Sequence, residues 1–453
     1  MGLFSTNFKT ALLAYGSSPP PLFTVLDVVW NGVGTKRYTD DALAYGTVGA
    51  EPRIEAGQID SIRSSVSQRV GDLGRQTHRV SLIDTDRTIS TWLMRYDMRR
   101  VPVTFRWGLP GVAEADWFVA FTGILTDWSA SSGTVELSTS TNDRILRGTV
   151  PSRSILKGWA PKAPQSSLGV YLPVVLGVHD GQGLLTSGMI PLIPYCLDAS
   201  AGYWYVVSLG YLKAVTRVYN ASSPTPLSVG TGANNYTVYN IALGGLFLTV
   251  IRIFSPSPVL TEADSITADV EGLTNVYDGT GSVISNPVEQ FQWMLQNLIY
   301  SDWNGGAYAT TAPVDETLCS IAASYATAFK QEGSQYIGGT RSQTSGNALI
   351  SSWLKSHLMM RARWSNLGEL GVFPLDHRYA PYAADYTFTG EEFGTFSYQT
   401  ASEGLATMIE SSYLYSAASG QYWMSLQVQD LERWLLEKIT ESYDLSWSGS
   451  RFA

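Results

Sequence analysis

Cysteine is scarce in this sequence, since Cys196 and Cys319 are the only two. Two thiols cannot build a disulfide framework, and they cannot supply the four ligands of a zinc or iron–sulfur site within one chain. We therefore expect no such centre, and the scarcity indicates folding in a reducing compartment.

Basic residues and long apolar runs are also in short supply. Lys and Arg number 30 against 39 Asp and Glu, which gives a formal charge of −9. With no basic stripe to neutralise phosphates, the outer surface is not expected to bind nucleic acid directly. No apolar run reaches the ~18 residues that span a bilayer, so no membrane span is expected. The N-terminus lacks the long apolar region of a secretory signal, and it predicts a short helix with one apolar side made of Phe4, Phe8, Leu12 and Leu13.

What is present indicates a large β-rich protein. A length of 453 residues suggests about three domains. A hydrophobic share of 44% and a charged share of 15% are those of a folded chain. Gly 42, Tyr 25 and Trp 14 favour pleated sheets joined by turns. The predicted fold class is α+β, mostly β.

The first part of the chain, residues 1–150, alternates short β runs with turns, which predicts a barrel or sandwich. The runs are 22–30, 36–39, 61–68, 77–84, 101–107, 117–127 and 133–140. Residues 84–93 interrupt them as a loop or helical turn across a barrel end. Prolines between 151 and 164 mark a boundary, and a second β domain is predicted over 165–285.

The period of the pattern changes to helical at Asn286-Pro287, a capping side chain followed by proline at the first helical position. Residues 286–385 are predicted to form an α+β domain. It has three helices, starting near 287, after Pro313 and at Gly346, and a hairpin over 358–375 packed on them. Residues 386–453 are predicted as a C-terminal β region, with strands at 386–388, 395–398, 408–415 and 422–428 and a short helix at 431–439.

Histidines give no catalytic pattern. His78, His179, His357 and His377 form neither an H-E-x-x-H pair nor a couple at ligand spacing. His179 precedes Asp-Gly and is expected at the tip of a turn. His377 follows an aspartate in a solvated loop.

The other reactive residues are also expected to be structural. Cys319 falls beside a helical apolar stripe and is expected in the core, and Cys196 has no basic neighbour in sequence to lower its thiol pKa. Glu391 and Glu392 are adjacent, so on a strand their side chains point to opposite faces. Four tryptophans on or beside apolar elements are expected to be buried, namely Trp128, Trp293, Trp353 and Trp364. We predict no enzyme activity and no catalytic, cofactor-binding or metal-binding residues.

Several segments together resemble the hub proteins of tailed-phage tail tips and baseplates, and of related gene-transfer and bacteriocin particles. In the first third, the resembling segments are 22–29, 53–62, 80–87, 121–127 and 135–146. In the middle, Leu172-Pro-Val-Val-Leu-Gly-Val178 is similar to a proline-led strand of that family. Ile266-Thr-Ala-Asp-Val-Glu-Gly272 followed by Asn286-Pro287 is the most telling likeness.

The resemblance implies tube-like β-barrel domains, an inserted β domain and a small helix-plus-hairpin domain. It implies a homotrimer that joins a distal tail or tail tube protein ring to a central fibre or spike protein. Its lumen would meet the tape measure protein and pass DNA, and an acidic lumen would repel phosphates. Such a protein is made in the bacterial host cytoplasm and ends in the virion. Some members of that family carry an iron–sulfur centre, and others carry a wall-degrading domain. Two cysteines are too few for the centre, and the sequence has no cell-wall hydrolase motif, so neither is expected here.

Two other interpretations remain open. One is a carbohydrate-active β protein, a glycoside hydrolase or lectin on a virion or secreted, that uses tryptophans and a carboxylate pair. The other is a structural protein of a different bacterial injection machine that shares tube-like barrels.

Overall fold

The computed structural model describes the larger part of the chain. The described residues are 5–15, 22–41, 49–59, 63–64, 73, 76–181, 188–220, 225–256, 259–309, 312–357, 360–374, 408–416, 421–429 and 440–445. They form two compact units. Unit 1 is Met1–Arg144, Asp315–Thr317 and Ala362–Val372, and unit 2 is Ile145–Val314, Leu318–Arg361 and Phe373–Ala453. The four-part division predicted from the sequence stays a prediction.

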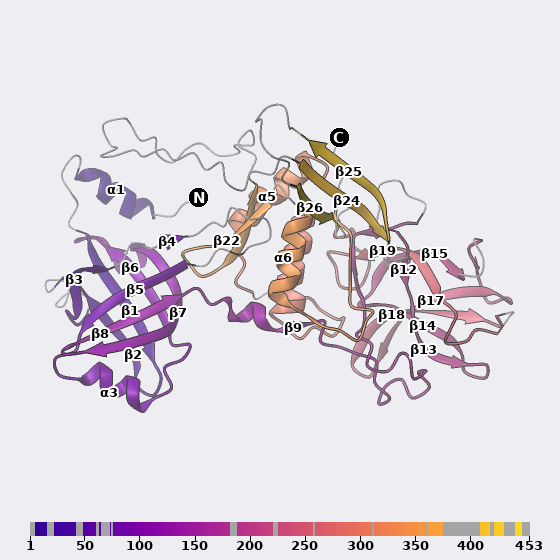
Figure 1. Ribbon diagram of the computed structural model, residues 1–453, viewed down its shortest axis with the longest axis horizontal. Coiled ribbons are helices and arrows are strands. Elements are labelled where there is room, and N and C mark those ends of the chain that lie inside the picture. The colour runs from indigo at the N-terminus through magenta and orange to yellow at the C-terminus, as the bar shows by residue number, and fades with distance from the viewer. Residues whose placement is uncertain are drawn as a thin grey trace. The chain divides into compact units, whose positions relative to one another are not determined.

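Unit 1 is built on one sheet that curls into a nearly closed barrel (Figure 1). The strand order is β2-β1-β6-β7-β8-β5-β3, with β4 also paired to β5. The two ends of this order meet at Glu51, whose N–H donates to Arg37 O and whose carbonyl accepts from Thr39 N, both at 2.8 Å. The strands are β1 Phe23–Trp30, β2 Gly34–Thr39, β3 Ile54–Ile59, β4 Arg63–Ser64, β5 Gln76–Ile83, β6 Pro102–Gly108, β7 Phe118–Ser131 and β8 Thr134–Ser140. The barrel expected from the sequence is confirmed.

The barrel core follows from alternation along the strands. On β8 every second residue is buried, and β5 behaves in the same way, so one side of each strand faces inward. Helix α3 (Thr88–Arg95) adds Ile89 and Leu93 to the same core. Asp84 begins this helix, because its carboxylate accepts from Ile89 N at 2.8 Å and Ser90 N at 2.9 Å. The segment expected to cross a barrel end is thus a two-turn helix.

Helix α1 (Thr6–Ala14) exists as predicted, but its apolar side is narrower than expected. Phe8 is the buried residue of the helix, whereas Leu13 is 73% exposed. The expected stripe was wrong at Leu13 because α1 rests on the short helix η1 (Glu114–Asp116) through polar contacts. Ser5 Oγ donates to Asp116 O at 3.0 Å and Asn7 Nδ2 to Asp116 Oδ2 at 2.8 Å. Phe4 lies outside the described residues.

The hairpin of β22 (Met360–Trp364) and β23 (Leu370–Pro374) forms where the sequence predicts it. Its central residues belong to unit 1 rather than to the helices on which it was expected to pack. Gln76 Nε2 donates to Trp364 O at 3.1 Å, and Asn366 Nδ2 donates to Val119 O. Amide side chains that bond distant carbonyls hold it there, and no spacing rule detects such bonds.

Unit 2 contains a β region with two main sheets. One has the order β13-β14-β18-β17-β16, and in the other β19 pairs with β11, β12 and β15. The strands are β9 Thr149–Val150, β10 Val174–Leu176, β11 Val178–His179, β12 Ile190–Pro191, β13 Ile193–Asp198, β14 Gly202–Leu209, β15 Leu212–Asn220, β16 Ser228–Val229, β17 Asn235–Leu243, β18 Leu246–Phe254 and β19 Ile266–Leu273. Gly244 and Gly245, both with positive φ, turn β17 back into β18. The second β domain expected here is therefore present as strands.

The three predicted helices are confirmed. They are α4 Pro287–Met294, which continues as the π-helical turn η3 Leu295–Ile299, α5 Glu316–Ala328 and α6 Gly346–Ser356. Short pairings accompany them, β20 Gln335–Ile337 with β10 and β21 Thr344–Ser345 with β9. Near the C-terminus, the predicted strands are present as β24 Met408–Ser416 and β25 Gln421–Gln429. They pair with each other, and β26 Thr440–Leu445 adds in parallel to β24. The strands predicted at 386–388 and 395–398 and the helix at 431–439 lie outside the described residues.

Candidate functional site

The segments that carry the sequence resemblance in the middle of the chain pack together on β19. Val178 of β11 pairs with Glu271 of β19, and Gly272 N donates to Gly177 O at 2.8 Å. The C-terminal ends of segments 172–178 and 266–272, about ninety positions apart in the chain, are thus hydrogen-bonded to each other, whereas β10 pairs with β20. These two motifs are therefore far apart in the sequence but adjacent in the structure.

Two glycines allow this close approach. A Cβ on Gly272 would lie 2.7 Å from the carbonyl oxygens of Gly177 and Val175. A Cβ on Gly177, where φ is +76°, would lie 2.0 Å from Gly333 O. Both obstacles are backbone atoms, which cannot rotate away, so only glycine fits at either position.

Asp269, the acidic residue of the second motif, is a completely buried carboxylate. It accepts hydrogen bonds from Gly181 N and from Tyr219 Oη, both at 2.9 Å, and lies 3.4 Å from Arg217 Nη1. Burial first, and the neighbouring Asp269 second, raise the pKa of Tyr219, which keeps that hydroxyl protonated as a donor. The carboxylate therefore joins β19 to β15 and to the turn after β11. Its contacts are those of a structural cross-link.

Asn286, the first residue of the Asn286-Pro287 motif, has two functions in the structure. Its Oδ1 accepts from Val288 N at 2.9 Å and begins α4, as the sequence predicts. Its Nδ2 also donates to Ala323 O at 3.0 Å and to Thr327 Oγ1 at 3.1 Å, which ties α4 to α5. Nothing in the local sequence indicated this second function.

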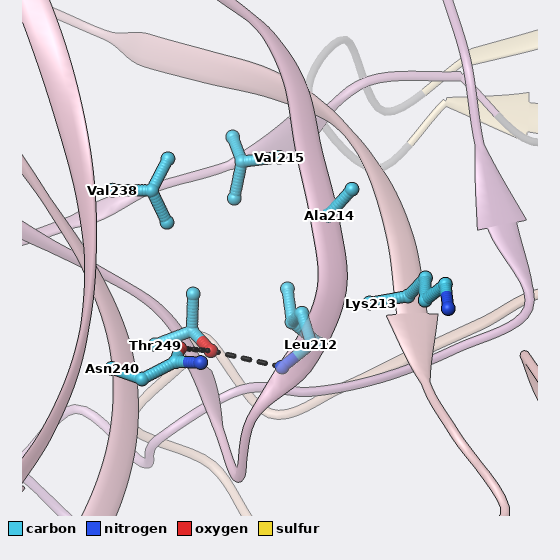
Figure 2. Close-up of a pocket in the computed structure, with 7 residues that line it drawn as sticks. All are labelled: Leu212, Lys213, Ala214, Val215, Val238, Asn240 and Thr249. Atoms are coloured by element: carbon cyan, nitrogen blue, oxygen red, sulfur yellow. Dashed lines mark hydrogen bonds between the residues drawn. The ribbon is translucent and has the colours of Figure 1, made fainter. Parts of the chain in front are cut away.

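A groove of about 310 Å³ opens between the two sheets of unit 2, where β15 and β17 diverge (Figure 2). Val215 and Val238 face each other across the gap (Figure 2). At its floor, Thr249 Oγ1 accepts from Leu212 N at 2.9 Å and bonds Asn240 Oδ1 at 3.0 Å. Lys213 points away, toward the carbonyls of Thr280 and Gly281.

Both strands beside the groove have open edges. Among the described residues, β15 forms a ladder only with β19, and β17 beyond Tyr236 only with β18, although Val218 O of β15 also accepts from Leu227 N at 2.8 Å. An open strand edge offers unpaired backbone donors and acceptors to another chain.

Charged residues outside the barrel form a ring of four. Arg37 contacts Asp27 at 2.7 Å and Glu114 at 2.6 Å, and Arg106 contacts the same two carboxylates at 3.3 and 2.9 Å. Hydrogen bonding from Arg37 lowers the pKa of Glu114. The ring joins β1, β2, β6 and η1, so these charges support the barrel wall.

The described histidines are buried, but the position expected for His179 was wrong. His179 is not at a turn tip. It ends β11, is buried, and its Nε2 lies 3.2 Å from Leu176 O. Burial lowers its pKa to about 4, and burial has the same effect on His357, whose Nδ1 lies 2.8 Å from Trp353 O. His78 packs edge-on against Phe105 inside the barrel. His377, Glu391 and Glu392 lie outside the described residues.

The cysteines and tryptophans lie largely where the sequence predicts. Cys319 is fully buried, and burial raises the pKa of the Cys196 thiol. Trp293, Trp353 and Trp364 are buried, and Trp128 is half-buried against the barrel core. In the described part of the chain, no three His, Cys, Asp or Glu side chains gather as metal ligands. No helix in that part is long and apolar enough to cross a membrane.

The fold and these contacts define a mostly β protein in which a nearly closed barrel accompanies a second unit of two sheets and helices. No protein-family model matches the sequence, and no curated protein matches it. Among solved structures, it is similar to a chain of the "Virion of native gene transfer agent (GTA) particle", with a TM-score of 0.24 and 15% identity. The match covers 59% of this chain and 84% of that one. A TM-score this low does not establish a common fold.

Proposed function

We propose that the chain is a structural protein of a phage-like virion, and that it forms the trimeric hub of a tail tip or baseplate. The observation that carries the proposal is the packing of the resembling segments. Residues 177 and 178 are hydrogen-bonded to residues 271 and 272 of β19. Gly177 also packs against Gly333, whose N–H donates to the carbonyl of Ser285, next to Asn286, at 2.8 Å. Segments chosen for their order in the chain are thus neighbours in space.

The barrel of unit 1 and the open edges of unit 2 support the same function. A hub needs barrels that stack against the rings of a tail tube and strands that pair between subunits. The open edges of β15 and β17 are such strands, and the partner that we assign to them is a neighbouring copy of the chain. Above and below, the partners would be a distal tail or tail tube ring and a central fibre or spike protein.

The proposed role involves no catalysis. The described histidines and cysteines are buried, and the buried carboxylate Asp269 is occupied by protein donors. The net charge of −9 suits a channel that DNA crosses without adhering. Contact with the tape measure protein and release of the genome through the lumen complete the proposal.

The test is the mass of the purified chain by light scattering, alone and with tail-tube or distal-tail protein, together with negative-stain images. A species of three times 49.4 kDa, or rings that form with the partner, is expected. A monomer that ignores both tail proteins would overturn the proposal.

Matched variants test the open edges. Val238→Lys puts a charge in the groove between β15 and β17 and should abolish the trimer while the circular dichroism stays unchanged. Val259→Lys, at a loop residue that is 66% exposed, is the control and should assemble normally. Equal assembly of the two variants would refute the role of these edges.

A further inference from the structure

A second cavity in unit 2, of about 270 Å³, lies beside α4 and η3. Its lining combines polar side chains with the aromatic rings of Trp293 and Tyr308. Three residues at helical spacing face it, Glu289, Gln292 and Gln296. Its volume is just below the range of about 300–1,000 Å³ that is usual for small-molecule pockets, so it suits a ligand the size of one sugar ring.

These three side chains have no protein partner within the described residues. The amides of Gln292 and Gln296 make no hydrogen bond there, although both are half-buried. Burial raises the pKa of Glu289, with no cation nearby to oppose the effect. Glu289 is exposed, and none of the three side chains has a buried polar atom, so a ligand with hydroxyl groups can bond them without displacing a protein partner.

The wall behind them is rigid. Trp293 meets Trp303 and Tyr308 edge to face, with ring centroids 4.9 and 5.7 Å apart. Tyr308 Oη donates to Thr274 O at 2.7 Å. Asn297, almost fully buried, accepts from Ala309 N at 2.8 Å and donates to Trp293 O at 3.0 Å. Groups held in this way offer a preformed surface to a ligand.

The backbone beside the cavity is also unusual. Residues Leu295–Ile299 form a π-helical turn directly after α4. Such turns are rare in helices and occur frequently at functional sites. The turn carries Gln296 and Asn297, so two of the lining residues stand on it.

We propose that this cavity binds a neutral saccharide. Amides both donate and accept hydrogen bonds, as sugar hydroxyls do, and one carboxylate adds an acceptor for hydroxyl donors. The uncompensated negative charge of Glu289 disfavours phosphate and other anions. The inference does not depend on trimer formation, because every residue named belongs to unit 2 of one chain.

The experiment is saturation-transfer NMR on the full chain with glucose, galactose and N-acetylglucosamine, and with glucose 6-phosphate and spermidine as charged probes. At least one neutral sugar should bind with a Kd near the millimolar range, and glucose 6-phosphate should bind more weakly than glucose. Failure of all neutral sugars to bind, or binding confined to the phosphate or the amine, would overturn the proposal.

Matched glutamine variants locate the binding. Gln292→Ala and Gln296→Ala should each raise the Kd about tenfold, the loss expected for one buried hydrogen bond. Gln331→Ala, at another half-buried glutamine of the same unit that lies outside the cavity, should leave it unchanged. A Kd that rises equally in the three variants, or in none of them, would exclude this cavity as the site. Trimer mass measured on the same samples reports separately on the proposed hub.

Discussion

Replacing Asp269 by alanine tests whether the second motif is a structural cross-link. The substitution leaves Tyr219 Oη and Gly181 N without an acceptor, and Tyr219 is only 7% exposed. Each stranded donor costs about 1–3 kcal/mol. The Arg217 side chain is 41% exposed, so the loss of its contact adds little. The expected loss of local stability is about 3–4 kcal/mol.

Hydrogen exchange measured by mass spectrometry suits this prediction better than global unfolding, because a chain of two units need not unfold in one step. Amides of β15 and β19 should exchange more than about hundredfold faster in the variant, since 1.36 kcal/mol is a factor of ten. Amides of the barrel strands should keep their rates. Asp264→Ala is the control, because Asp264 accepts hydrogen bonds from Thr261 in an exposed turn. Equal exchange in β19 for the two variants would refute the assigned role.

Three further predictions concern the same unit. Gly272→Ala should destabilise the unit by about 1–3 kcal/mol, because the new Cβ would contact backbone carbonyls. Gly148→Ala is the control and should be tolerated, because a Cβ there meets nothing within 4 Å. Urea titration compares the two variants. His179 and His357 have pKa values of about 4 when folded, below the usual 6.5, so the unfolded chain binds more protons as the pH falls. The contribution of these histidines to the free energy of unfolding should therefore be fully present above pH 6.5 and decrease down to about pH 4. Replacing either histidine by glutamine should flatten the dependence of the melting temperature on pH. An unchanged dependence would contradict the assignment. Asn286→Ala should cost about 1–2 kcal/mol, because it removes both the helix cap and the hydrogen bonds to α5. Asn286→Asp should keep the cap and lose only the bonds to α5. Equal melting temperatures for the two variants would argue against the link to α5 as a second function of Asn286.

The sequence predicts the elements of this fold better than their contacts. Strand alternation and the Asn286-Pro287 cap are local signals, so β1, β5, β8 and α4 lie within a residue or two of their expected limits. The position of His179 was missed because the residues Asp-Gly after it indicate a turn, yet β11 includes His179, its side chain is buried, and the turn begins only at Gly181.

The candidate sites depend on contacts that no spacing rule contains. The link from Asp269 to Gly181 joins residues 88 positions apart, and the cavity beside α4 includes Tyr308, from a separate loop. The glutamines of that cavity looked like an ordinary polar helix face. What distinguishes them is the cavity that they line together with Trp293 and Tyr308, which no spacing reveals.

The hairpin at residues 362–372 has a consequence for the order in which the protein is made. Its bonds to Gln76 and Val119 complete unit 1, whose other strands all precede Arg144. A ribosome must therefore add residues 145–361 before the barrel has its last neighbour, which at about 5–20 residues per second takes about 10–45 s. During that interval the barrel strands emerge without this cover, and a chaperone that meets the nascent chain would find the carbonyl of Val119 and the amide of Gln76 still facing water.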